Sequence, residues 1–263
     1  MTQKSLICLL MLGVCLFTSC ADDDNENSQN NTNYFPLATS NSWNYQNTFT
    51  SQDQDDMESE ETLTVTDSSE VGGNTLYEFE TSNPLNAAPT TNALSNGSLY
   101  KQNSSLIYNG AFGLGLPEFP ELNFEIQDGK IYDKNASAGT ELFAFSDTLQ
   151  ESIEGAPILI NYTITSVMNE SFEVLEVNNE IYEDVISSTL NVNMVITTEV
   201  GIPPNFLEEE EVVEVTNYFA KDVGLIQSET DINFKFITFP TVTLDDFTFQ
   251  IKQDLQDYNV NIE

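Results

Sequence analysis

The chain has 263 residues and a net charge of −36, because 43 Asp and Glu residues outnumber seven lysines, and it contains neither arginine nor histidine. Nucleic acid is excluded as a partner, since phosphate binding needs clustered Lys or Arg. The missing side chains also exclude catalytic triads, histidine zinc sites and arginine clamps on phosphate.

The first residues have the pattern of a secretory signal peptide. Lys4 precedes an apolar run from Leu6 to Phe17, and small residues stand just before Cys20. A run of about 12 residues is too short to cross a hydrocarbon core that needs roughly 20. The pattern predicts a signal peptide over residues 1–19. A buried core helix is the alternative, but it would need a polar face that this run lacks.

The small residues followed by Cys20 resemble the lipobox of bacterial lipoproteins. The resemblance implies that Cys20 is lipidated after cleavage and that its acyl chains hold the protein at a membrane, each buried methylene contributing about 0.8 kcal/mol. The three cysteines are Cys8, Cys15 and Cys20. The mature domain is therefore expected to have no disulfide and no thiol chemistry.

Residues 20–33 comprise this cysteine and an acidic tether. The segment ADDDNENSQNNTN has no apolar periodicity, so it is expected to be disordered. Asp22, Asp23 and Asp24 resemble the acidic export signal of Bacteroidota lipoproteins. That resemblance implies anchoring in the outer membrane with the domain facing the cell exterior. Ordinary solubility of the tether is the alternative.

From Tyr34 onward, apolar and polar residues alternate with a period of two. The runs at 158–165, 190–196, 232–236 and 247–251 show the alternation clearly. Such runs are strands with one buried face and one wetter face. About a dozen of them, without a long helical pattern, predict an all-β domain over residues 34–263. We expect a single antiparallel, strongly curved sheet or open half-barrel.

Two glycine dipeptides are predicted to form hairpin turns. Asp128-Gly129 separates apolar runs at 124–126 and 131–132, and Gly72-Gly73 separates runs at 64–65 and 76–77. Both suit two-residue turns whose central residues need a positive φ.

An irregular apolar stretch covers residues 108–122 (YNGAFGLGLPEFPEL), which is too rich in Gly and Pro for a regular strand throughout. Ligand-binding residues often lie in loops, so one interpretation is that this stretch forms a lid or mouth over an apolar cavity. The alternative is a loop tucked over one end of the core. The candidate ligand residues of this stretch are Phe112, Leu114, Leu116 and Phe119.

Two distant segments resemble a recurrent type of Bacteroidota surface lipoprotein of uncharacterised function. The first is YFPL at 34–37 followed by Trp43, and the second is the tyrosine strand and VGLI turn at 218–226. The resemblance implies a curved antiparallel β domain, loosely similar to half-barrel lipoprotein carriers, and no catalytic residue. Physically, Trp43 is expected to fill the core, and Gly224 to supply a positive φ or a close backbone approach.

Acid–base chemistry would fall on carboxylates, tyrosines or lysines. Glu118 and Glu121, near the apolar stretch, are the candidate pair of carboxylates for glycoside hydrolysis. The alternative is that both are solvated surface charges. The acidic runs at 53–61, 208–211 and 245–246 lack the spacing of a calcium loop and are expected to be charged loop tips. We therefore expect no catalytic residue, no metal site and no cofactor.

Asp147-Thr148-Leu149 resembles the O-glycosylation acceptor of Bacteroidota, which implies that Thr148 is a modification site. The leading functional hypothesis is a non-enzymatic cell-surface lipoprotein that binds an apolar ligand, a glycan or a partner protein. A structural or accessory subunit of a surface complex is the first alternative. A carboxylate-based glycosidase is the second.

Overall fold

The computed structural model describes residues 33–51, 54–114, 122–153, 156–198, 205–237 and 245–262. The predicted residues outside these ranges are Cys20, Asp22, Asp23, Asp24, Leu116, Glu118, Phe119 and Glu121. The described residues form thirteen strands and one helix: β1 (Ser42–Ser51), β2 (Gln54–Val71), β3 (Asn74–Thr81), α1 (Pro89–Ser95), β4 (Gly97–Gln102), β5 (Ser105–Leu114), β6 (Leu122–Asp133), β7 (Glu141–Ile153), β8 (Ala156–Met168), β9 (Phe172–Val177), β10 (Glu180–Thr198), β11 (Leu207–Ala220), β12 (Gly224–Phe234) and β13 (Phe247–Asn259).

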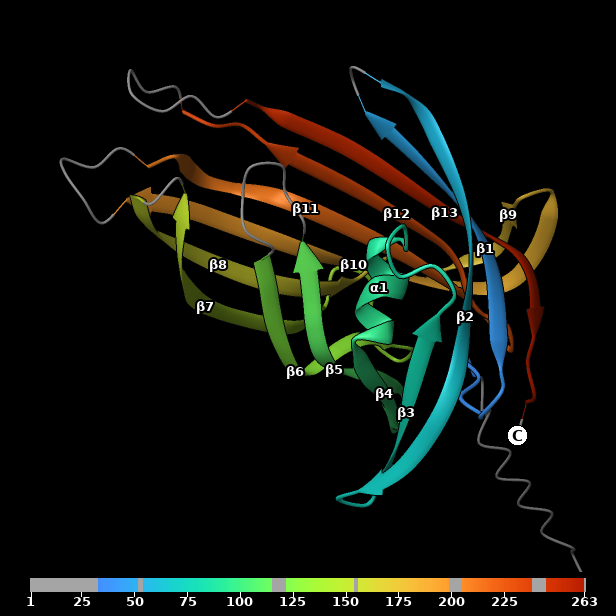
Figure 1. Ribbon diagram of the computed structural model, residues 1–263. Coiled ribbons are helices and arrows are strands. Elements are labelled where there is room, and N and C mark those ends of the chain that lie inside the picture. The colour runs from blue at the N-terminus through green and yellow to red at the C-terminus, as the bar shows by residue number, and fades with distance from the viewer. Residues whose placement is uncertain are drawn as a thin grey trace, which may run out of the picture. The chain divides into compact units, whose positions relative to one another are not determined.

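All thirteen strands belong to one antiparallel sheet (Figure 1), which confirms the predicted fold class. The strand order is β6-β5-β4-β3-β2-β1-β13-β12-β11-β10-β8-β7, and β9 pairs with β10. Most neighbours in the sheet are also neighbours along the chain. There are two exceptions. Strand β8 pairs with β10, and β1 pairs with β13, which joins the first and last strands at the middle of the sheet.

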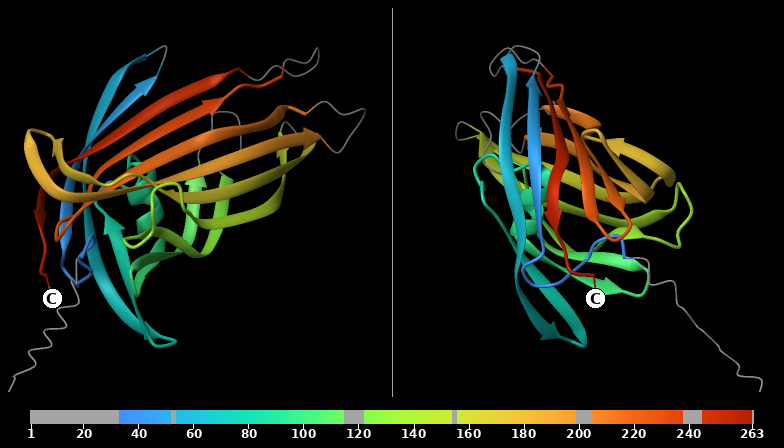
Figure 2. Two further views of the ribbon diagram at one scale, coloured as in Figure 1. Left: turned by 180° about the vertical axis from the view of Figure 1, so that it is seen from behind. Right: turned by 90° about the vertical axis from the view of Figure 1, so that its right-hand side faces the viewer.

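The sheet curls until its two end strands, β6 and β7, approach each other, so that it is nearly closed as a barrel with one seam (Figure 2). Side chains bridge this seam. The Ser166 hydroxyl on β8 donates to the backbone carbonyl of Lys130 on β6 at 2.8 Å. The rings of Phe124 on β6 and Tyr162 on β8 meet edge to face with centroids 4.6 Å apart. The curvature encloses the cluster of buried apolar side chains.

Alternation along the strands places the apolar residues inside. On β8 the side chains of Ile158, Ile160, Tyr162 and Ile164 are buried, and their neighbours in sequence face outward. Strand β10 continues the same layer with Val192, Met194 and Ile196. The period-two pattern was therefore a correct guide to the core.

The two predicted hairpins have different outcomes. Gly72 and Gly73 connect β2 to β3 with φ of 62° and 89°, which confirms the first turn. The Asp128-Gly129 hairpin is wrong, because β6 runs through both residues without reversing. Asp128 does have a positive φ of 52°, but it lies in an irregularity of the β5–β6 pairing. Its N–H donates to the Asn109 side chain at 2.6 Å, so the extra residue is absorbed as a bulge.

The two segments of the family resemblance meet in space. The ring of Phe35 packs against Trp43 with centroids 4.9 Å apart, and the Trp43 indole N–H donates to the Val223 carbonyl at 2.7 Å. Gly224 has a φ of 117°, and a Cβ there would lie 2.8 Å from the Trp43 indole nitrogen. The expectations for Trp43 and Gly224 are confirmed: the indole fills the core because the glycine lets it approach the backbone.

The packing at Gly224 predicts that substitution by alanine destabilises the protein more at this position than at Gly139. Gly224→Ala combines backbone strain with a clash against Trp43, whereas Gly139→Ala has strain alone, since its φ is 80° and no atom lies within 4 Å of the added Cβ. Urea denaturation should show a loss of about 3 kcal/mol for Gly224→Ala and about 1 kcal/mol for Gly139→Ala. Equal losses would contradict the role assigned to the indole contact.

Candidate functional site

The helix α1 lies inside the curve of the sheet (Figure 1), on the chain segment between β3 and β4. It has only seven residues and begins at Pro89, whose fixed φ suits the first position of a helix. Its N-cap, Ala88, has no side chain that can cap the free N–H groups. The helix therefore depends on groups supplied by the sheet. No helix in the part of the chain that the structure describes is long and apolar enough to span a membrane.

A row of polar side chains crosses the inner face of the sheet beneath α1. The six residues pair in register on six consecutive strands, and five of them are buried. The rows on either side are mainly apolar. We call this row the polar belt: Ser59 (β2), Asn47 (β1), Gln253 (β13), Ser228 (β12), Asn217 (β11) and Ser188 (β10).

The carboxylate of Glu61, next to the belt on β2, joins it to the helix. One carboxylate oxygen accepts from the side-chain amides of Asn47 and Gln253, both at 2.7 Å. The same oxygen accepts from the Thr91 hydroxyl at 2.8 Å and the Ala88 N–H at 3.0 Å. The other oxygen accepts from the Thr81 hydroxyl at 2.7 Å.

Glu61 is only 3% exposed, and none of the ion pairs among the described residues involves it. A buried charge needs hydrogen bonds or a counter-charge, and here five neutral donors take that role. Two of the donors belong to the start of α1. Glu61 therefore fixes the start of α1 to β2 through the Ala88 N–H and the Thr91 hydroxyl.

Further hydrogen bonds hold the rest of the helix. The Thr90 hydroxyl lies 2.9 Å from both the Asn217 amide oxygen and the Ser228 hydroxyl of the belt. At the other end, the Tyr108 phenol on β5 donates to the Ala93 carbonyl at 2.8 Å. The helix is thus attached to both walls of the sheet largely through polar contacts.

Two belt amides are incompletely bonded. The side-chain oxygens of Asn47 and Gln253 are buried and have no hydrogen-bond partner among the described residues. Their N–H groups point to Glu61, which leaves these oxygens facing away from it. An unpaired buried polar group costs about 1–3 kcal/mol, so the contact between the belt and α1 is less stable than its number of hydrogen bonds suggests.

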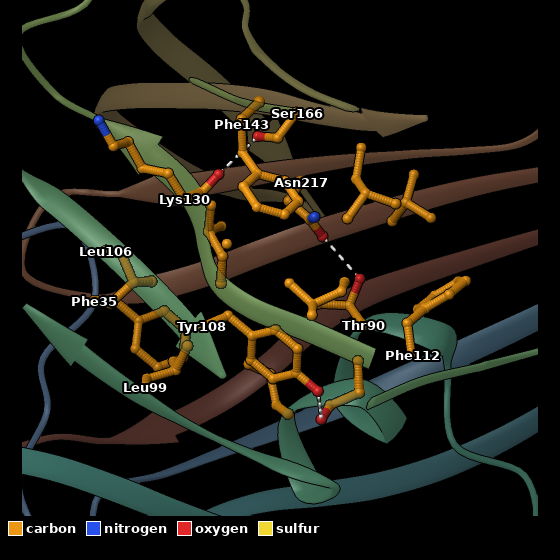
Figure 3. Close-up of a pocket in the computed structure, with 18 of the residues that line it drawn as sticks. Phe35, Thr90, Leu99, Leu106, Tyr108, Phe112, Lys130, Phe143, Ser166 and Asn217 are labelled. Atoms are coloured by element: carbon orange, nitrogen blue, oxygen red, sulfur yellow. Dashed lines mark hydrogen bonds between the residues drawn. The ribbon is translucent and has the colours of Figure 1, made fainter. Parts of the chain in front are cut away.

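Beside α1 the sheet encloses a small apolar cavity (Figure 3). Its volume is about 70 Å³, enough for a few water molecules or one small apolar group and well below the roughly 300–1,000 Å³ of usual ligand pockets. Most of the lining is aliphatic or aromatic. The lining side chains come from both walls and include Phe35, Leu99, Leu106, Tyr108, Phe112, Phe143, Leu190 and Phe219, with Thr90 and Leu94 from α1.

Two of the four candidate loop residues lie in the part of the chain that the structure describes. Phe112 and Leu114 lie on β5 rather than in a loop, and both are buried. Phe112 lines the cavity. Thr148 is exposed on β7, where its hydroxyl donates to the Asn161 amide oxygen at 2.8 Å. These placements leave ligand binding and glycosylation as predictions.

Sequence reasoning missed the polar belt and Glu61, which had been grouped with the charged loop tips. A signal was present: Asn47 follows Trp43 and Tyr45 at the inward positions of β1, and Gln253 stands between Ile251 and Leu255 on β13. A polar residue at an inward position implies a buried partner. Over the described ranges, no group of three or more His, Cys, Asp or Glu side chains could hold a metal ion.

Comparison with known proteins gives distant likenesses only. No protein-family model matches the chain, and no characterised protein matches it by sequence. A crystal structure of a candidate lipoprotein from Parabacteroides distasonis is similar at 12% identity and a TM-score of 0.31, over 87% of this chain and 99% of that one. A LolA superfamily protein from Nitrosomonas europaea is similar at 7% identity and a TM-score of 0.18, over 85% and 86%. At these values neither likeness bears on function.

The role of Glu61 can be tested with a matched pair of substitutions. Glu61→Gln removes the charge that gathers the five donors and should lower the free energy of unfolding by about 2 kcal/mol. Glu60→Gln, one residue earlier and exposed, should change it by less than about 0.5 kcal/mol. Urea denaturation measures both. A Glu61→Gln protein as stable as the Glu60→Gln protein would contradict the anchoring role.

Because the Tyr108 phenol is buried, we predict that the folded protein loses stability at alkaline pH. Burial, and secondarily the charge of Glu125, raises the pKa of the Tyr108 phenol in the folded protein. The unfolded phenol ionises near pH 10, so this tyrosine's contribution is fully present below pH 10 and falls as the pH rises above it. Tyr108→Phe should be about 1 kcal/mol less stable at pH 7 and should lose less stability than wild type between pH 9 and 11. Denaturation at each pH tests this, and identical pH slopes would disprove it.

Proposed function

We propose that this protein is a non-enzymatic lipoprotein, anchored through Cys20 and facing the cell exterior, whose curved sheet binds an apolar ligand beside α1. The observation that supports it best is the apolar cavity next to a helix that is fixed mainly by hydrogen bonds. Binding would draw on the hydrophobic effect, at about 25 cal/mol for each Å² of apolar surface buried.

The size of the cavity requires movement if the ligand is larger than a small apolar group. At about 70 Å³ it does not hold an acyl chain as it stands. Displacing α1 would break its hydrogen bonds to Glu61 and the belt, so water that enters beside the helix would have to replace the two donors that Glu61 loses. Undocking would expose Leu94 and the apolar side chains of the sheet that line the cavity, which is the surface that an apolar ligand would cover. We infer that the ligand enters as α1 leaves the belt.

A second candidate function is a structural or accessory subunit of a surface complex. The observation in its favour is the small volume of the cavity, because an interior that is filled by the protein's own side chains leaves little room for a ligand. One edge of β7 has no strand partner among the described residues, and an extended segment of another protein can pair with such an edge. This candidate predicts that α1 stays docked.

The non-enzymatic part of the proposal rests on residue types. Histidine and arginine are missing from the sequence, and the buried Glu61 is fully engaged with five donors. Glu118 and Glu121 lie outside the described residues, so the glycosidase alternative stays a prediction.

A disulfide lock tests whether α1 must move for binding. Thr90→Cys combined with Ser228→Cys replaces two hydroxyls that lie 2.9 Å apart, one on α1 and one on β12. After signal cleavage Cys20 is the only native cysteine, so no other disulfide is expected to compete. The oxidised protein should bind an uncharged fluorescent probe, N-phenyl-1-naphthylamine, at least tenfold more weakly than the reduced protein.

The matched control is the single substitution Ser228→Cys, whose probe binding should not respond to oxidant. Equal binding by the oxidised and reduced double variant would contradict a moving helix. Failure of the wild type to bind the probe at all would favour the accessory role.

A further inference from the structure

The outer face of β7, β8 and β10 carries no charged side chain over four rows of the sheet. The rows pair in register across the three strands, with the first residue of each on β7, the second on β8 and the third on β10. We call this surface the uncharged face. Its rows are Ala144–Thr165–Asn191, Ser146–Thr163–Asn193, Thr148–Asn161–Val195 and Gln150–Leu159–Thr197.

The neighbouring outer surface is acidic. On β11, Glu214 and Glu211 pair with Asn191 and Asn193 at the border of the uncharged face. Burial raises the pKa of the Glu214 carboxyl, and the charges of Glu211 and Asp231 raise it further. Since the whole chain carries a net charge of −36, an uncharged area of this size is an exception that the overall composition does not predict.

Hydroxyl and amide groups dominate the uncharged face. Ser146 and Thr163 hydroxyls lie 2.8 Å apart, and the Thr148 hydroxyl donates to the Asn161 amide oxygen at 2.8 Å. The Asn161 amide N–H groups and the remaining hydroxyl lone pairs are left for other partners. A hollow of about 470 Å³ lies over these side chains and also involves Asn193 and Val195.

The nearest carboxylate on β7 leaves the strand on the opposite face. Asp147 pairs with the buried Tyr162, and its side chain accepts from the Thr148 N–H at 2.8 Å. An anionic ligand in the hollow would meet the acids of β11 at its border. A neutral ligand meets no repulsion and finds donors and acceptors spaced about 4.8 Å apart across the strands.

We propose that the uncharged face binds a neutral glycan chain. A glycan presents many hydroxyl groups, and their hydrogen bonds match the Ser, Thr and Asn side chains without a charge being desolvated. From strand spacing and rise, the four rows span about 300 Å². This area suits several sugar units but is well below the roughly 800 Å² that each partner contributes to a stable protein interface. The site is separate from the internal cavity and does not depend on the apolar-ligand proposal.

A glycan array tests the proposal on the full mature lipoprotein in detergent, with neutral and acidic oligosaccharides printed side by side. The wild type should bind one or more neutral glycans and no acidic ones. Asn161→Asp keeps the acceptor for Thr148 but places a negative charge in the hollow, and it should weaken binding at least tenfold.

The matched control is Asn44→Asp on β1. Asn44 is also exposed and also accepts a cross-strand threonine hydroxyl, from Thr62 at 2.7 Å. Its variant should bind as wild type does, and the oxidised Thr90→Cys, Ser228→Cys protein should as well. Circular dichroism and urea denaturation would check that both variants are folded.

Four results would overturn the proposal. They are the absence of binding to any neutral glycan, binding to acidic glycans, equal weakening by Asn44→Asp and Asn161→Asp, and a solution dimer that Asn161→Asp dissociates. The last would assign the uncharged face to a protein contact instead.

Discussion

The hydrogen bonds of Glu61 organise the interior of this protein. One buried carboxylate gathers donors from β1, β3 and β13 and from the start of α1, and it does so without a cation among the described residues. Burying the charge is tolerable only because all five donors are present at once. The position of the helix, the continuity of the polar belt and the shape of the cavity therefore all depend on this contact.

The polar belt and the apolar rows of the sheet have different roles. Apolar rows build the core and line the cavity, whereas the polar row gives a seven-residue helix a place to dock. A helix of that length has little stability of its own, so its position reflects its contacts. Because those contacts are polar and two belt oxygens are unpaired, the helix is the part of the interior best suited to move. The uncharged face, in contrast, is set by the pleating of regular strands.

Local pattern made much of the fold predictable. Period-two alternation identified the strands of β8 and β10, and Gly72-Gly73 identified a turn, because both depend on neighbours in sequence. Asp128-Gly129 misled because a positive φ serves a bulge as well as a hairpin, and only the continuous partner strand β5 distinguishes them. Glu61 could not be told from a surface acid, since its donors Gln253 and Thr91 lie far away in sequence. The cavity was equally hidden, because closure at the β6–β7 seam brings its walls together.

Native-state hydrogen exchange tests the central claim most directly, that α1 is held by polar contacts and can leave the belt while the sheet stays intact. The amides of Asn92 and Asn96 bond within or at the end of α1, and those of Thr230 and Ile232 lie in the core strand β12. We predict that the α1 amides exchange through a local opening, with a free energy below that of global unfolding and little dependence on denaturant. Exchange of the α1 amides only through global unfolding, with the same free energy as the β12 amides, would contradict the account.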